Sequence, residues 1–208
     1  AAIFFAQKYC GEEPVLKKLQ ELTSTDSDFL GTRDHFPLLS QRLGVKPQIP
    51  PRKGGMFALS LARFYTNTSD PPHAVEVLRH IRGVREQEIL RTALHQQAGP
   101  DSGTHFSIIN PVLLLEAKAA NVMELDQQDR NDSGHLWIAA FATRAYLREL
   151  NMKPDHGRAL VTLANRVLDL ADSHRGIDLL ERFQLDVTQC LPKLEPNHPS
   201  VVSFLQKG

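Results

Sequence analysis

Apolar residues along the chain recur mostly three and four positions apart, as on one face of a helix. After Pro14, which suits a first helical turn, Val15, Leu16, Leu19 and Leu22 follow this spacing and predict a short helix. Capping residues, first-turn prolines and the same period predict further helices over residues 36–43, 56–67, 71–82, 84–97, 134–150, 154–171 and 177–190.

The segment 134–150 is the most apolar of these predicted helices. From Leu136 to Ala142 its residues are apolar on every side, a pattern typical of a helix buried in a core. We therefore expect this helix at the centre of the fold, with Trp137, Ile138 and Phe141 largely buried.

Strand signals are weak by comparison. Residues 105–110 are compatible with a short β segment, and residues 57–64 alternate briefly between apolar and polar positions. Neither segment has a partner at hairpin spacing, and the chain contains no Asn-Gly or Asp-Gly turn. The sequence therefore predicts an all-α fold, a single compact domain of about eight to ten helices over residues 12–191.

Both ends of the chain are apolar. Residues 1–11 form the expected N-terminal arm, and residues 192–208 form a C-terminal arm that contains prolines. Apolar ends must dock either on their own domain or on a neighbouring copy, and exchange between copies would produce self-assembly. The arm residues expected to make these contacts are Ile3, Phe4, Phe5, Val201, Val202, Phe204 and Leu205.

Composition excludes several protein classes. The 208 residues hold 24 Lys and Arg against 24 Asp and Glu, so the chain has no net charge that would favour nucleic acid overall. Two cysteines exclude a disulfide framework and a cysteine-rich zinc module. The first six residues are too short for a signal peptide, and no apolar run approaches the about 20 residues of a membrane span. We expect a soluble cytoplasmic protein with no membrane partner.

Catalytic and metal-binding motifs are absent. His95 and His105, and His73 and His80, do not match a metal-ligand spacing. The acidic cluster Glu124, Asp126, Asp129 and Asp132 lacks the glycine and terminal glutamate of an EF-hand and is typical of a solvated loop. No nucleophile elbow, Walker loop or dinucleotide-binding motif occurs. We predict no catalytic residue, metal or cofactor.

Charge is unevenly distributed within the neutral total. Residues 51–95 carry seven basic and four acidic groups, whereas residues 101–132 carry two basic and six acidic groups. Arginines at three-residue intervals near Phe64 and Tyr65 are the ingredients of a groove for single-stranded RNA, since guanidinium groups bind phosphates and rings stack on bases. The alternative is a solvated helix face. The residues expected to contact RNA are Arg52, Lys53, Arg63, Tyr65, Arg79, Arg82, Arg85 and Arg91.

Three classes of function follow from these patterns. The first is a non-catalytic, self-assembling helical protein, a nucleocapsid or coat subunit that forms a homo-oligomer and binds single-stranded RNA. The second is a helical adaptor that binds another protein. The third is an all-α enzyme with a site of His and carboxylate residues. A coat subunit should bind single strands with salt dependence and form rings or filaments, an adaptor should remain monomeric and bind one partner, and an enzyme should contain a concave pocket with convergent His and carboxylate groups.

Overall fold

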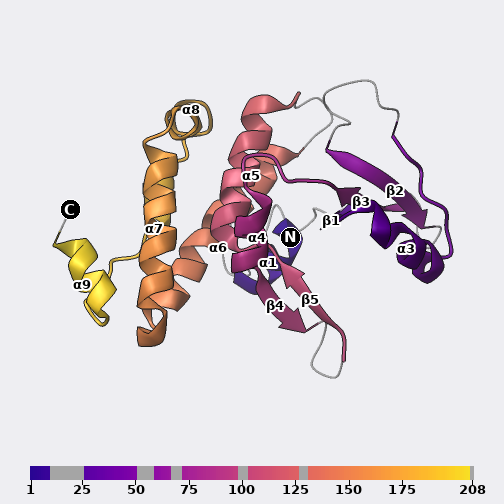
Figure 1. The fold of residues 1–208 in the computed structure, drawn as a ribbon. Helices are drawn as coiled ribbons and strands as arrows, with labels where there is room; N and C mark the ends of the chain where they lie inside the picture. The colour runs from indigo at the N-terminus through magenta and orange to yellow at the C-terminus, as the bar shows by residue number, and fades with distance from the viewer. Residues whose placement is uncertain (10–25, 51–58, 67–71, 98–102, 127–130, 207–208) are drawn as a thin grey trace. The chain divides into compact units, whose positions relative to one another are not determined.

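The computed structural model describes residues 1–9, 26–50, 59–66, 72–97, 103–126 and 131–206. Over these residues the fold is mixed α/β, with eight α-helices, a three-stranded sheet and a two-stranded hairpin (Figure 1). The all-α prediction is therefore wrong. Two compact units divide the chain, one of residues 1–21 and 88–208 and the other of residues 22–87.

The sheet of the second unit has the strand order β1-β3-β2. Strand β1 (Asp26–Leu30) runs parallel to β3 (His73–Leu78), and β2 (Ser60–Thr66) runs antiparallel to β3. Between β1 and β2 the chain forms a 3-10 turn, η1 (Arg33–His35), and helix α3 (Phe36–Leu43). The predicted helix over residues 36–43 is confirmed, and Gly44 ends it in the left-handed conformation at φ 67° that glycine adopts readily.

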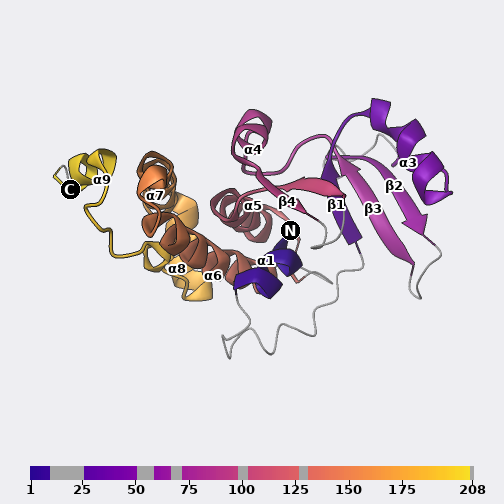
Figure 2. The same ribbon diagram turned by 90° about the horizontal axis from the view of Figure 1, so that it is seen from below.

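Helix α3 covers one face of this sheet (Figure 2). Phe64 of β2 and Val77 of β3 are buried on that face, and Phe36 of α3 meets Phe64 edge to face, with ring centroids 6.0 Å apart. Leu39 and Leu43 complete the helix side of the contact. Burial of these aliphatic and aromatic side chains is the main favourable contribution to the stability of the unit.

The strands explain where the helix predictions fail. Strand β2 occupies 60–66, within the helix predicted over 56–67, and β3 occupies 73–78, within the helix predicted over 71–82. Both strands alternate between the two faces of the sheet and contain aromatic and β-branched residues, which favour a pleated surface. Pairing between distant strands overrides the helical reading, because it buries the alternate apolar residues beneath α3.

The region predicted as one helix over 84–97 also divides. It forms α4 (Glu86–Thr92) followed by β4 (Leu94–Gln97), which pairs antiparallel with β5 (His105–Ile108). The weak strand signal at 105–110 is thus correct, and its partner lies earlier in the chain. The short helix predicted after Pro14 lies outside the described residues.

The other unit is largely helical. Its remaining elements are α1 (Ala2–Tyr9), α5 (Pro111–Glu124), α6 (Asp132–Asn151), η3 (Pro154–His156), α7 (Gly157–Ala171), α8 (His174–Phe183), η4 (Val187–Cys190) and α9 (Pro199–Leu205). Helix α6 packs against α1, α5, α7 and η4 (Figure 1). Leu136 and Ile138 are buried there, and Trp137 and Phe141 are partly buried.

Side-chain caps fix two of these helices. Ser173, predicted as a cap, accepts a hydrogen bond from the backbone N–H of Gly176 at the start of α8. Asn110 accepts from the N–H of Leu113 at the start of α5 and donates to the hydroxyl of Thr92 at 2.7 Å. The cap therefore also ties α5 to the end of α4.

No described helix combines the length and the apolar character needed to cross a membrane.

Candidate functional site

The sheet face opposite α3 carries charged residues in two rows across the strands. Residues two apart on a strand share a face, and paired residues of neighbouring strands share it too. The first row is Asp26 on β1, Ala74 on β3 and Tyr65 on β2. The second row is Asp28 on β1, Glu76 on β3 and Arg63 on β2. We call Asp26, Asp28 and Glu76 together the carboxylate face.

Arg63 supplies the counter-charge within the second row. Its Nε donates to Glu76 Oε1 at 2.9 Å, and this hydrogen bond is the main cause of the raised pKa of Arg63. Asp28 lies on the other side of Glu76, in register with it across the parallel pair. The two rows thus hold three carboxylates and one guanidinium.

This arrangement breaks two local rules of sheet formation. Aspartate is disfavoured in strands, yet β1 contains two in five residues. Like charges placed directly opposite each other destabilise a sheet, yet Asp28 faces Glu76. Departures of this kind are expected at functional sites, where the sequence serves chemistry as well as stability.

The carboxylate face offers oxygen ligands for a hard divalent cation. Asp26 and Asp28 are exposed, and their carboxylates would be accessible to a ligand from solution. Over the described part of the chain, no group of three or more His, Cys, Asp or Glu side chains is arranged to hold a metal ion by itself. Mg²⁺, however, is commonly held by one or two carboxylates together with the phosphates of a substrate.

A basic turn follows β3 at one edge of the same sheet. It comprises residues 79–85, in which Arg79, His80 and Arg85 are exposed and Arg82 is partly buried. The backbone N–H of Gly31 donates to the carbonyl of Leu78 at 2.9 Å. The chain therefore leaves β1 and β3 at the same edge, and the exposed Arg33 lies three residues beyond β1.

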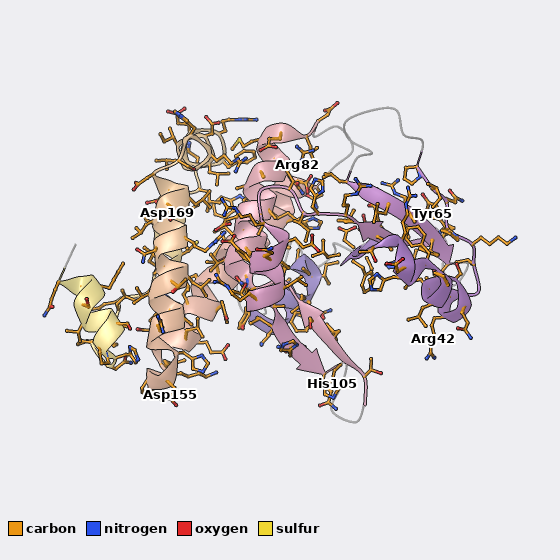
Figure 3. All side chains as sticks on the ribbon, viewed as in Figure 1. Arg42, Tyr65, Arg82, His105, Asp155 and Asp169 are labelled. Carbon is orange, nitrogen blue, oxygen red and sulfur yellow. The ribbon has the colours of Figure 1, made fainter. Side chains whose placement is uncertain are left out.

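The structure separates the residues expected to contact RNA. Arg52 and Lys53 lie outside the described residues, and Arg91 lies on α4 in the helical unit. Arg63 and Tyr65 share the face of the sheet that bears the carboxylates, and Arg82 lies in the basic turn (Figure 3). Of these residues, only Arg79, Arg82 and Arg85 belong to one short segment, in which Arg79 and Arg85 are exposed.

The aromatic residue Phe64, which the sequence analysis placed near these arginines, does not reach the surface. Phe64 is fully buried beneath α3. It is part of the hydrophobic core and cannot stack on a base.

Both apolar arms pack within the helical unit. At the N-terminus α1 contacts α6, Phe5 is buried, and Phe4 meets Phe106 edge to face. At the C-terminus α9 contacts α7, and Val201 is buried. The other arm residues range from partly buried, at Ile3, Val202 and Phe204, to 47% exposed at Leu205.

The histidines considered as ligands make local contacts. His95 shares a hydrogen bond with the hydroxyl of Ser107 across the hairpin, at 3.0 Å. His73 shares one with the hydroxyl of Ser27 at 2.9 Å. Each pair joins neighbouring strands.

Members of the acidic cluster at 124–132 form ion pairs between helices. Asp132 pairs with Lys118 at 3.2 Å, and Glu124 pairs with Arg175 at 2.5 Å. Asp129 lies outside the described residues. These pairs favour a structural role for the cluster.

The sequence analysis did not single out Asp26, Asp28 or Glu76. The available signal was the Asp-Ser-Asp alternation at 26–28, which places two carboxylates on one face if the segment is a strand. This interpretation requires residues 26–28 to lie in a strand, and the predominance of helical spacing in the sequence led to an all-α prediction instead.

Comparisons with protein-family models, with curated proteins and with solved structures found no significant match to this chain.

Proposed function

We propose that the sheet unit catalyses a divalent-cation-dependent reaction on a phosphate-bearing substrate, with Asp26 and Asp28 as the cation ligands. The observation that supports this function is the second row of the carboxylate face, where Asp28 lies opposite Glu76. Two adjacent carboxylates concentrate negative charge on this face, which favours a bound cation, and Arg63 pairs with Glu76.

The residues of this face have distinct roles in the proposal. Asp26 and Asp28 bind the cation directly, because both are exposed and share one face of β1. Glu76 is held by Arg63 and adds negative charge next to Asp28. A bound cation would neutralise charge on the substrate phosphates, which lowers the barrier to attack at phosphorus.

This proposal keeps the enzyme class from the sequence analysis but changes its fold and its residues. The chemistry rests on carboxylates of a sheet, with no histidine assigned a part.

Manganese titration tests the assignment directly. Mn²⁺ is added to the protein in the presence of ATP as a phosphate-bearing probe, and bound Mn²⁺ is measured by electron paramagnetic resonance. We expect Asp28→Asn to reduce binding at least about tenfold, since a charged ligand is replaced by a neutral amide of the same shape. Asp169→Asn, which removes an exposed carboxylate from α7, serves as the matched control. Equal binding by wild type and Asp28→Asn would overturn the proposal.

A second candidate function is binding of single-stranded RNA at the basic turn. Arg79 and Arg85 are exposed within seven residues of each other, and Arg82 lies between them. Guanidinium groups so close together suit successive phosphates of a flexible strand. These arginines are the feature that supports the nucleocapsid hypothesis, because a nucleocapsid subunit must bind RNA phosphates.

The second candidate function also includes self-assembly and a cytoplasmic location. A coat subunit would form a homo-oligomer in the cytoplasm, and a free, buried Cys190 is compatible with a reducing compartment. Burial of Phe5 and Val201 within their own unit favours the alternative in which the arms stabilise that unit. Light scattering of the purified protein, with and without RNA, distinguishes an assembling subunit from an adaptor that remains monomeric.

A further inference from the structure

Helix α6 carries two aromatic and two basic residues in one stripe. Trp137, Phe141, Arg144 and Arg148 are spaced by four, three and four residues, so they follow one line along the helix. Arg144 and Arg148 are exposed, and Trp137 and Phe141 are partly exposed. The α6 stripe, defined by these four residues, extends over about 16 Å at the helical rise of 1.5 Å per residue.

The two rings lie next to each other. Their centroids are 6.0 Å apart and their planes are inclined by 32°. Aromatic residues placed in this way usually bury their faces in a core, and the all-round apolar pattern of residues 136–142 predicted that outcome. Here the buried side of α6 is formed by other residues, including Leu136, Ile138 and Leu147.

The two arginines differ from their neighbours in the helical unit. Arg166 bonds both carboxylate oxygens of Glu116 and also pairs with Glu88, and Arg175 pairs with Glu124. Among the described residues, neither Arg144 nor Arg148 makes an ion pair. The α6 stripe therefore presents positive charge that the unit does not neutralise by direct contact.

We infer that the α6 stripe binds single-stranded RNA, with bases stacking on Trp137 and Phe141 and phosphates meeting Arg144 and Arg148. Rings on which bases stack, beside guanidinium groups that donate hydrogen bonds to phosphates, are the two elements of single-strand recognition. This inference does not rest on the chemistry proposed for the sheet unit, because it involves different residues and requires no cation.

The surroundings favour RNA over a protein partner. The residues that contribute most to protein–protein binding lie at the centre of a patch that excludes water, so a protein-binding stripe should have exposed apolar residues around it. The exposed large apolar residues of the helical unit lie on other elements, at Leu90, Ile177, Leu180 and Leu205, except Met152 just past the end of α6. The stripe also begins beside the exposed polar Ser133.

The chain contains a built-in reporter for this test, because Trp137 is its only tryptophan. A uridine oligonucleotide of about 12 nucleotides is titrated into the whole protein at about 50 mM salt while the emission of Trp137 is recorded. We expect saturable quenching as bases stack on the indole. The double variant Arg144→Ala/Arg148→Ala should weaken binding and flatten the slope of log K against log salt by about 1.4.

A matched double variant controls for net charge. Arg42→Ala/Arg158→Ala removes two exposed arginines from α3 and α7 and should leave both the quenching and the slope unchanged. Circular dichroism verifies that each variant is folded.

Two outcomes would overturn the inference. RNA binding that leaves Trp137 emission unchanged would place RNA elsewhere, such as at the basic turn. An absence of binding at low salt would leave the stripe to a protein contact. Neither outcome affects the manganese test of the carboxylate face, which measures a different ligand on different residues.

Discussion

Asp28 and Glu76 lie directly opposite each other on parallel strands, and Arg63 binds Glu76 from the third strand. The central carboxylate of this row is thus held between a like charge and an opposite one. Arg63 therefore contributes a counter-charge to this row of the candidate site.

Removal of this guanidinium should destabilise the sheet unit. Arg63→Ala leaves Glu76 beside Asp28 with its internal counter-charge lost. Because the Arg63 side chain is 44% exposed and screened by water, we expect a loss of about 1 kcal/mol in the free energy of unfolding. Urea denaturation measures this difference. The variant Arg63→Ala/Glu76→Gln should recover most of it, and a double variant no more stable than the single one would contradict this account.

The N-terminal helix should contribute to the stability of the helical unit. Phe5 is fully buried, so Phe5→Ala should lower the free energy of unfolding by about 3–5 kcal/mol. Thermal denaturation and light scattering are measured on the same samples. A lower melting temperature at unchanged particle size is expected if α1 serves its own unit. A smaller particle with an unchanged melting temperature would indicate instead that the arm joins neighbouring copies.

The basic turn makes its own salt-dependent prediction. Replacing Arg79, Arg82 and Arg85 with Ala should weaken RNA binding and flatten the slope of log K against log salt by up to about two units, at about 0.7 for each phosphate contact. Fluorescence anisotropy of a labelled oligonucleotide follows binding. An unchanged slope in the triple variant would show that these arginines form a solvated face.

Glu149 should make stability depend on pH. Lys153 hydrogen-bonds its carboxylate at 2.6 Å, the main cause of the lowered pKa of Glu149, and Tyr9 donates a second hydrogen bond at 3.0 Å. A pKa lower in the folded chain than in the unfolded chain stabilises the fold above the unfolded value, and this contribution is lost as pH falls through the folded value.

Glu149→Gln should therefore be less stable than wild type at pH 7, by about 0.5 kcal/mol for this partly exposed group. The difference should shrink in acid, as the pH falls through the lowered pKa of Glu149 and the wild-type carboxylate becomes protonated. Denaturant titrations across that range measure it. A difference that stayed constant with pH would mean that packing, not charge, distinguishes the two side chains.

Local signals explain why several helices could be predicted from the sequence. Gly44 marks the end of α3, Pro154 precedes α7, and Ser173 caps α8 through a residue three positions away. Each signal involves residues only a few positions apart, so it can be recognised in the sequence without knowledge of distant contacts.

The sheet and its carboxylate face depend on contacts between distant residues. The pairing of β1 with β3 joins Asp28 to Glu76, which are 48 positions apart, and nothing local in either segment names the other as partner. Val75 and Val77 alternate over too short a strand to outweigh the helical spacing around them. The partly exposed stripe on α6 escaped prediction for a similar reason, since its exposure depends on which faces α1, α5 and α7 cover.

The strand order β1-β3-β2 also bears on how the chain reaches its native state. Strands β2 and β3 are separated only by residues 67–72, so they can pair at a small cost in loop-closure entropy. The chain between β1 and its partner β3 is much longer, because it includes α3 and β2. We expect the hairpin to form first and β1 to join it later, because long-range parallel pairing is slow. Asp26 and Asp28 would then meet Glu76 only after the hairpin has formed, so the candidate site and its electrostatic repulsion arise late in folding.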